Sequence, residues 1–352
     1  MVGILLFGSA VFSVQATFTA LYVFGDGLST STDNPSIGPY YYGQRYSNGR
    51  VWIEVLAQRQ GLTYDFNKNW SYFGDTSTDL VAHVSSFNIA LSDASNALFV
   101  VWVNNADLYY PALSTSTNMV MWTNAINQSQ ANHYKSITNL YAKGVRTLIM
   151  PNAVDISTVP QFNGSNNTNF FHLRCIDYNV AFLNTLNQIR VSCPDLTIYS
   201  PDFFTLLTNL LAHPANYSVT NALNNRGLSI DVIGDNALSD KTTNGPGTNH
   251  IFWDARNPTA MVHMWMANLT QQLISPAQIS QVTPFNGSNQ LDLVNVPIGQ
   301  DGLVLGSTNL MQPGWNTYAS ISSTNAAESI IIPAYSPQCF YRLSFPFSWT
   351  WP

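Results

Sequence analysis

Residues 20–31 constrain the fold of this chain more than any other stretch, because an apolar run stops there at two closely spaced glycines. Ala20 to Phe24 is apolar and aromatic, which is typical of a buried β-strand. Gly25-Asp26-Gly27 breaks the run, and Ser and Thr residues that favour helix N-termini follow it. Many α/β enzymes present a reactive side chain where a strand ends in a tight glycine turn and leads into a helix. The stretch therefore predicts the first strand and turn of an α/β domain.

Apolar runs alternate with helical patterns over roughly the next 250 residues. The run at 97–103 is apolar at almost every position, which indicates a parallel strand buried on both faces. Alternating strands and helices predict a mainly parallel sheet that helices cover on both sides, with the functional site at the carboxyl ends of the strands. Further strands are expected at 145–150 and 196–199, and helices at 50–59, 76–87, 117–142, 169–191, 201–214 and 259–274.

Beyond about residue 276 the helical period disappears. Short β-like runs, such as 279–282 and 302–305, are separated there by clusters of Asn, Gly, Ser and Pro. We therefore expect an α/β domain over 17–275 and a small all-β module over 276–352. The module resembles the small C-terminal β modules of secreted bacterial proteins.

The N-terminal residues have the pattern of a secretory signal. Gly3 to Ser13 is an apolar run too short to span a bilayer, and Val14-Gln15-Ala16 offers a small-residue cleavage site. The basic residues that usually precede such a run are absent, so a buried first segment is the alternative. We predict a signal peptide over 1–16 and a secreted or extracytoplasmic protein, in the periplasm or at the cell surface.

Composition excludes several classes of function. Charged residues make up 9% of the chain, and the net charge of −6 with 13 Lys and Arg argues against nucleic-acid binding. No other segment is apolar enough to predict an integral membrane span. Phosphate-cradling glycine motifs and zinc motifs are absent, and Cys175, Cys193 and Cys339 have no metal-like spacing. We therefore expect no cofactor and no metal.

Four short blocks carry a family resemblance. They are Phe24-Gly25-Asp26-Gly27-Leu28-Ser29, residues 69–77, Asn104 to Asp107, and residues 251–259. In this order they resemble the four blocks of the SGNH or GDSL-type hydrolases, across roughly residues 17–275. The resemblance implies a flavodoxin-like three-layer SGNH fold with a parallel central sheet. It also implies an esterase or lipase site that acts on carboxylic esters.

The resemblance assigns a role to each site position, and three of the family's residues are replaced. Gly27 stands where the family has its nucleophilic serine, and Asn257 stands where it has the histidine base. Asp254, the acid that orients this base, is retained. The oxyanion would be held by the backbone N–H groups of Gly27 and Gly74, whereas Ala106 occupies the position of the donor asparagine.

Three nearby residues are candidate substitutes for the missing groups. Ser29 could serve as a nucleophile, His263 as a base and Asn105 as an oxyanion donor. The alternative interpretation is structural: Ser29 caps a helix, His263 packs in the core, and Asn105 lines the end of a strand. Ser29 and His263 could act only in a rearranged site, because a base must lie within hydrogen-bond reach of its nucleophile.

Three hypotheses of function follow. Loss of a serine triad lowers turnover by about 10⁶-fold, so the first is a pseudo-hydrolase that binds an acyl, glycan or other small ester-like ligand without turnover. The second is an active esterase or lipase with a rearranged site. The third is a structural or adhesive surface protein that acts through the C-terminal β module. We also expect Gly27 to relieve a strained nucleophile turn, so that Gly27→Ser would lower stability.

Overall fold

The computed structural model describes residues 18–36, 38–311, 314–334, 336 and 338–345. The predicted signal peptide, residues 1–16, lies outside the described residues. Within the described part of the chain, no helix is both long and apolar enough to cross a membrane.

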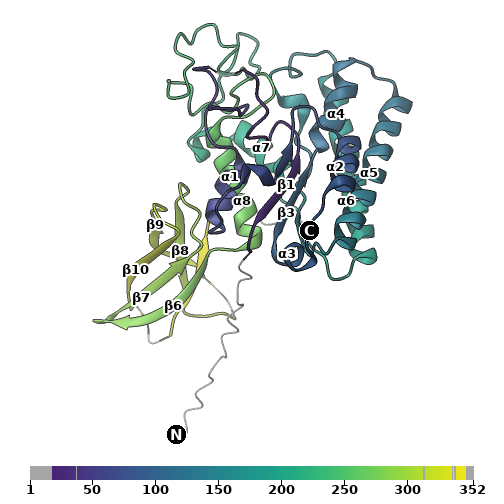
Figure 1. Cartoon of the computed structure of the whole chain (residues 1–352). Helices are drawn as coiled ribbons and strands as arrows, with labels where there is room; N and C mark the ends of the chain where they lie inside the picture. The colour runs from purple at the N-terminus through teal and green to yellow at the C-terminus, as the bar shows by residue number, and fades with distance from the viewer. Residues whose placement is uncertain (1–17, 37, 312–313, 335, 337, 346–352) are drawn as a thin grey trace.

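A five-stranded parallel sheet forms the centre of the larger part of the molecule (Figure 1). Its order, β2-β1-β3-β4-β5, places the first strand beside two strands that follow it in the chain. All five side chains of β3 are buried, because β1 and β4 flank it and helices cover both faces. The strands are β1 (Leu21–Gly25), β2 (Asn69–Ser71), β3 (Leu98–Trp102), β4 (Thr147–Ile149) and β5 (Thr197–Tyr199).

Helices form a layer on each face of this sheet (Figure 1). One layer contains α1 (Trp52–Arg59), α7 (Phe203–Ala212) and α8 (Ala260–Ile274). The other contains α2 (Ser77–Ser86), α4 (Asn104–Leu113), α5 (Met119–Ala142) and α6 (Thr168–Ser192). The prediction of a three-layer α/β fold with a parallel sheet is confirmed. The short elements are α3 (Leu91–Asn96) and the 3₁₀ turns Phe66–Lys68, Ile156–Thr158 and Pro214–Tyr217.

The C-terminal part is all-β, as expected, and consists of two antiparallel three-stranded sheets. The sheets have the orders β10-β7-β6 and β11-β8-β9, and they bury apolar side chains such as Leu291, Val304 and Ile332. The division into domains at residues 275 and 276 stays a prediction. The strands are β6 (Gln278–Phe285), β7 (Ser288–Val294), β8 (Gly302–Ser307), β9 (Asn316–Ile321), β10 (Ala327–Pro333) and β11 (Phe340–Ser344).

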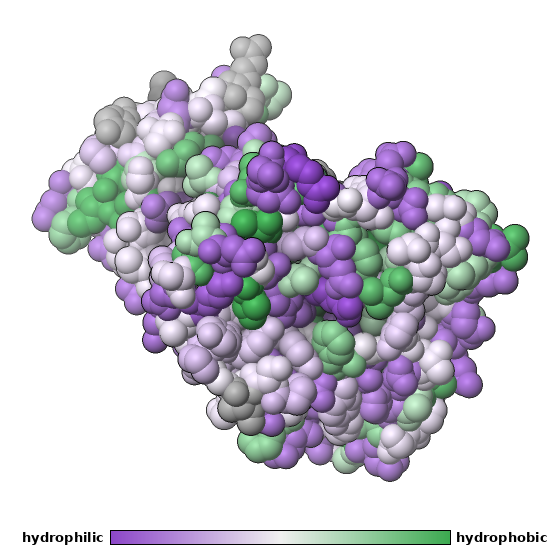
Figure 2. All heavy atoms as spheres, turned by 90° about the horizontal axis from the view of Figure 1, so that it is seen from above, coloured by the Kyte–Doolittle hydropathy of each residue, from purple (hydrophilic) through white to green (hydrophobic). Residues whose placement is uncertain are grey.

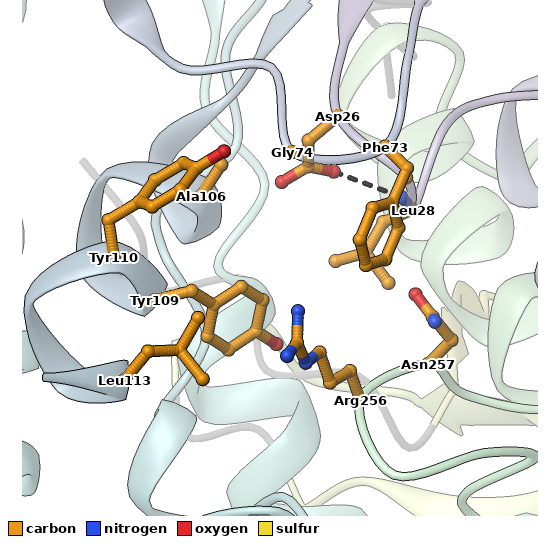
Figure 3. A pocket seen from close by; sticks show the side chains of 11 residues that line it. Asp26, Leu28, Phe73, Gly74, Ala106, Tyr109, Tyr110, Leu113, Arg256 and Asn257 are labelled. Atoms are coloured by element: carbon orange, nitrogen blue, oxygen red, sulfur yellow. Dashed lines mark hydrogen bonds between the residues drawn. The ribbon is translucent and has the colours of Figure 1, made fainter.

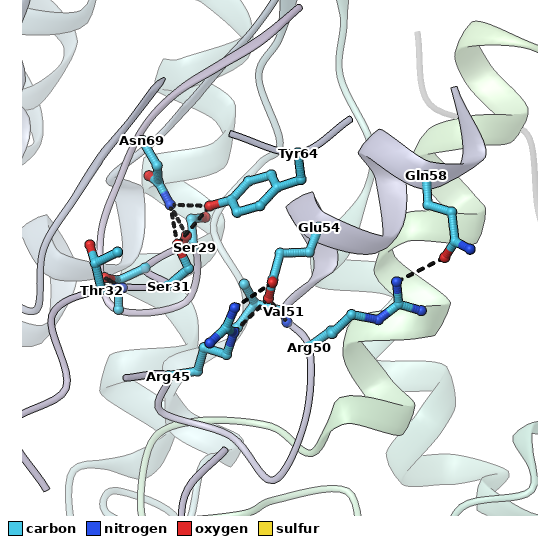
Figure 4. Close-up of polar contacts among 11 residues, drawn as sticks. Ser29, Ser31, Thr32, Arg45, Arg50, Val51, Glu54, Gln58, Tyr64 and Asn69 are labelled. Carbon is cyan, nitrogen blue, oxygen red and sulfur yellow. Dashed lines mark hydrogen bonds and ion pairs between the residues drawn. The ribbon is translucent and has the colours of Figure 1, made fainter. Parts of the chain in front are cut away.

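Two elements near the site carry features that the sequence pattern did not indicate. Residues 104–113 form α4 directly after β3, although the pattern suggested only a polar strand end, and Pro111 lies inside this helix. The long segment between β1 and α1 is irregular, and a bidentate ion pair anchors it (Figure 4). Arg45 donates from Nη2 to Oε1 of Glu54 at 2.6 Å and from Nε to Oε2 at 2.8 Å.

A buried polar cluster joins α2, α4 and α5. The Asp107 carboxylate of α4 accepts hydrogen bonds from the backbone N–H (3.0 Å) and Oγ (3.2 Å) of Ser77, the first residue of α2. Ser129 of α5 donates to the other carboxylate oxygen at 2.5 Å. Burial raises the pKa of Asp107 and lowers that of the neighbouring His133. Asp107 therefore fixes the start of α2 beside the turn that carries Gly74.

Replacing Asp107 should destabilise the fold, because it leaves buried hydroxyl and N–H donors without an acceptor. We expect Asp107→Ala to lower the free energy of unfolding by about 3 kcal/mol. The matched control is Asp93→Ala on α3, whose side chain is exposed and which should change stability by less than about 0.5 kcal/mol. Urea denaturation of both variants measures the difference. Equal stabilities would show that the Asp107 cluster does not hold these helices together.

Candidate functional site

A pocket of about 190 Å³ lies at the carboxyl ends of β1, β2 and β3 (Figure 3). An engineered apolar cavity of about 150 Å³ holds one benzene molecule, so the pocket suits a short acyl chain or a single ring. Its walls come from the turns after β1 and β2, from α4 and from the loop before α8. The lining residues are Asp26, Gly27, Leu28, Phe73, Gly74, Ala106, Tyr109, Tyr110, Leu113, Arg256 and Asn257.

The surface at this end of the molecule is largely polar. Figure 2 shows it as mostly purple and white, with hydrophobic residues in small separate groups. At the pocket itself, Phe73, Tyr110 and Leu113 are between 42% and 56% exposed. The pocket therefore has an apolar rim that a ligand can reach.

The turn after β1 places a buried carboxyl group in the pocket wall. Asp26 Oδ1 accepts a hydrogen bond from the Leu28 N–H at 3.0 Å (Figure 3), whereas Oδ2 is buried with no partner among the described residues. Burial raises the pKa of Asp26 to about 7. A large part of this side chain is therefore protonated near neutral pH.

Gly27 lies beside Asp26 without the backbone strain that we expected. Its φ is outside the left-handed region, so glycine is not required here by conformation. A Cβ atom at this position would lie 3.0 Å from Cδ2 of Phe73, the movable end of a half-exposed ring. The expectation that Gly27 relieves a strained turn is therefore wrong, and Gly27→Ser needs only a small shift of Phe73.

Two glycines of the expected oxyanion site line the pocket. The N–H groups of Gly27 and Gly74 donate no hydrogen bond to any acceptor in the described part of the chain. Gly74 has a φ of 85°, a conformation that favours glycine. Ala106 also lines the pocket, but its methyl group offers no donor.

Asn257 keeps the contact with Asp254 that an imidazole base would make. Its Nδ2 donates to Oδ1 of Asp254 at 2.9 Å and to Oδ2 at 3.0 Å. Asp254 also accepts from the Asn257 N–H at 2.8 Å and from the Tyr41 hydroxyl at 3.1 Å, and burial raises its pKa. The Asn257 carboxamide oxygen points toward Phe73 (Figure 3). It can accept a hydrogen bond there but cannot take up a proton at neutral pH.

Ser29 lies away from the pocket. Its side chain is fully buried, and its Oγ accepts a hydrogen bond from Nε1 of Trp52 in α1 at 3.0 Å. On the other side, Nδ2 of Asn69 donates to the Ser29 carbonyl at 2.9 Å (Figure 4). The turn after β1 therefore directs Ser29 toward α1, and the structure does not bring it to a base.

The other two candidate substitutes are also turned into the protein. Asn105 Oδ1 accepts from the Val154 N–H at 3.0 Å, so this side chain braces the loop after β4. His263 is buried within α8, where burial lowers its pKa to about 3. Neither residue lines the pocket.

Tyr109 and Arg256 are among the lining residues that had no role in the predictions from the sequence. The Arg256 guanidinium lies 5.5 Å from the ring centre of Phe73 and 5.8 Å from that of Tyr109, and its Nε donates to Gln161. The Tyr109 hydroxyl is buried without a partner among the described residues and points toward Arg256 (Figure 3). The position of Arg256 between Asp254 and Asn257 was the one available signal in the sequence.

No metal centre accompanies these groups. Within the described residues, no cluster of three or more His, Cys, Asp or Glu side chains is arranged to hold a metal ion.

Comparison with known proteins shows the family of the chain. The family model described as GDSL-like Lipase/Acylhydrolase matches residues 21–270. The chain belongs to this family, as the four sequence blocks predicted.

Individual relatives are distant. The thermolabile hemolysin of Vibrio parahaemolyticus serotype O3:K6 is 20% identical over 246 residues, which are 66% of this chain and 56% of the hemolysin. The chain thus spans little more than half of that relative. The acetylxylan esterase Axe2 from Geobacillus stearothermophilus is similar in structure at 12% identity, over 74% of this chain and 96% of Axe2, with a TM-score of 0.42. The lipase Lip_vut3 from a goat rumen metagenome has 10% identity, coverage of 72% and 97%, and a TM-score of 0.43.

Proposed function

We propose that this protein is a pseudo-hydrolase, a member of an ester-hydrolase family that binds a small acyl or glycan ester without turning it over. The observation that carries the proposal is the pair formed by Asn257 and Asp254. Asn257 holds the place and the acid contact of a base but cannot accept a proton. Gly27, across the pocket, has no side chain to attack a carbonyl.

Each step of serine-ester hydrolysis lacks a participant in this pocket. Acyl transfer needs a nucleophilic oxygen or sulfur, a base to take its proton, and donors for the oxyanion. The described lining residues supply the donors, through the N–H groups of Gly27 and Gly74, but no serine or cysteine. The site is thus equipped to hold a carbonyl oxygen and to do little more.

An active site built from the candidate substitutes is not supported by their positions. Ser29 contacts Trp52 and His263 is buried in α8, so neither can reach an ester held at Gly27 and Gly74. Esterases typically turn over 1–10³ substrates per second. We expect the natural protein to hydrolyse p-nitrophenyl acetate and p-nitrophenyl butyrate far below this range.

Variants of three residues serve as comparisons in this ester-hydrolysis assay. Asn257→Ala should weaken binding of a non-hydrolysed ester analogue, because the variant removes a polar side chain from the pocket, and it should not raise the rate of hydrolysis. A rate in the enzyme range that falls with Ser29→Ala or His263→Ala would overturn the proposal and establish a rearranged esterase.

We also propose that the protein is secreted or extracytoplasmic, which rests on the signal-like pattern of residues 1–16. The test is the intact mass of the protein recovered from its native source. A mature chain that begins near residue 17 is expected, and a chain that retains residues 1–16 would contradict the prediction.

A further inference from the structure

The pocket contains a cation whose charge is not neutralised by an acidic side chain. No ion pair within the described residues involves Arg256, and the bond from Nε to Gln161 leaves both terminal nitrogens without a hydrogen-bond partner there. The guanidinium is half-buried and lies beside the rings of Phe73 and Tyr109. A positive group in such a place attracts an anion more strongly than one in open solvent does.

The free polar groups of the pocket are mostly donors. They are the N–H groups of Gly27 and Gly74, the hydroxyl of Tyr109 and the terminal nitrogens of Arg256. Burial raises the pKa of Tyr109, so its hydroxyl stays protonated and can donate. The acceptors among the lining side chains are the carboxamide oxygen of Asn257 and Oδ2 of Asp26, which is buried without a partner in the described part of the chain (Figure 3). A ligand that satisfies this set must itself be rich in acceptor oxygens.

A carboxylate meets this requirement better than an ester does. It offers two equivalent acceptor oxygens and a negative charge. A guanidinium group can bind both oxygens of a carboxylate with a pair of parallel hydrogen bonds. An ester carbonyl offers one strong acceptor and no charge.

The negative groups near the pocket do not cancel this preference. Asp26 is buried, and burial raises its pKa to about 7, so that proton uptake near neutral pH reduces its repulsion of an anion. Asp254 is also engaged by four donors, two from the side chain and backbone of Asn257, one from the Arg256 N–H and one from Tyr41.

We infer that the pocket selects the carboxylate of a short-chain acid over the matching ester, and that Arg256 determines this selectivity. The inference rests on the proposed function, because it assigns the charge of the ligand that the same pocket holds without turnover. Phe73, Tyr110 and Leu113 then face the aliphatic end, and the volume of about 190 Å³ limits the chain to a few carbons.

Calorimetric titration of the full chain with butyrate, methyl butyrate, butyramide and inorganic phosphate tests the inference. We expect butyrate to bind at least about tenfold more tightly than the two neutral ligands, which is the effect of one charge-assisted hydrogen bond. Phosphate should bind more weakly than butyrate, since it has no apolar end for the rim. Equal affinities for butyrate and butyramide, or tighter binding of phosphate, would overturn the assignment.

Three arginine variants distinguish the role of Arg256 from a general effect of positive charge. Arg256→Gln should weaken butyrate binding at least about tenfold and leave butyramide within about twofold, whereas Arg226→Gln, at an exposed position, should leave both unchanged. Arg256→Lys should retain part of the preference for butyrate. If Arg256→Gln keeps its melting temperature and also keeps the full preference, the inference is wrong.

The same samples keep this inference separate from the proposed function. Release of butyrate from methyl butyrate, followed by proton NMR, reports turnover. Turnover at enzyme rates would overturn the proposed function, whatever the affinities are. Tight binding of the ester without turnover, together with no preference for the acid, would leave the proposed function standing and overturn the carboxylate assignment alone.

Discussion

Replacing Gly27 by Ser, Ala106 by Asn and Asn257 by His in one variant should raise the hydrolysis of short acyl esters at least about a thousandfold over the natural protein. The physical reason is that the supporting parts of the site are in place. Asp254 already lies within hydrogen-bond distance of the side chain at 257, and the two glycines of the expected oxyanion site line the pocket. A serine at 27 displaces only the end of the Phe73 ring.

Controls identify the source of any gain. Gly27→Ser alone should add little, because a serine hydroxyl without a base is a weak nucleophile. Adding Asp254→Ala to the triple variant should remove most of the gain, since this residue orients the new histidine. Initial rates with p-nitrophenyl acetate, and melting temperatures for all variants, provide the data. A folded triple variant no faster than the natural protein would show that the pocket is not a disarmed hydrolase site.

The sequence predicted the elements with strong local signals. The continuous apolar run 97–103 indicated the central strand β3, and the four blocks placed Gly27 and Asn257 at the edge of the sheet. Strand β9 was missed because residues 316–321 have no alternation of apolar and polar side chains, and only Ile321 is buried. Its strand conformation depends on pairing with β8, which no local pattern encodes.

The cationic character of the pocket could also not be predicted from the sequence. Tyr109 reaches the site because residues 104–113 coil into α4, a helix with Pro111 inside it that local propensity does not favour. Arg256 could have been noted from its place in the last block, but its neighbours come from three separate segments. Ser29 is close to the site in sequence but not in space. Its hydroxyl points away from the pocket and accepts a hydrogen bond from Trp52.

Asp26→Asn should make the protein more stable at pH 8 than the natural chain, with no such gain at pH 4. The pKa of Asp26 rises from its ordinary value of 3.8 to about 7 in the fold, because the carboxyl group is buried. Between about pH 4 and pH 7, Asp26 is therefore protonated in the folded protein but ionised in the unfolded chain. The stabilising contribution of this proton is complete below pH 4 and is lost as the pH rises through 7.

A pKa difference of about three between the folded and unfolded chains corresponds to about 4 kcal/mol. Asparagine cannot ionise, but its side-chain oxygen can still accept the hydrogen bond from the Leu28 N–H. The difference in unfolding free energy between Asp26→Asn and the natural protein should thus grow by up to about 4 kcal/mol from pH 4 to pH 8. Urea denaturation at four or five pH values measures it. Asp93→Asn, an exposed carboxylate, is the control and should show less than about 0.5 kcal/mol of change.

Asp26→Asn must be compared with the natural protein at each pH, because the titration of His263 changes the stability of both with pH in the direction opposite to that of Asp26. Burial lowers the pKa of His263 to about 3. Below pH 6.5, His263 is therefore protonated in the unfolded chain but stays neutral in the folded protein until the pH approaches 3. That contribution to stability is complete above pH 6.5 and is lost as the pH falls. Between pH 4 and 6.5 the two groups offset each other in the natural protein, and Asp26→Asn should therefore be the more acid-sensitive chain. A free-energy difference that does not change with pH would mean that Asp26 ionises in the fold as it does in the unfolded chain.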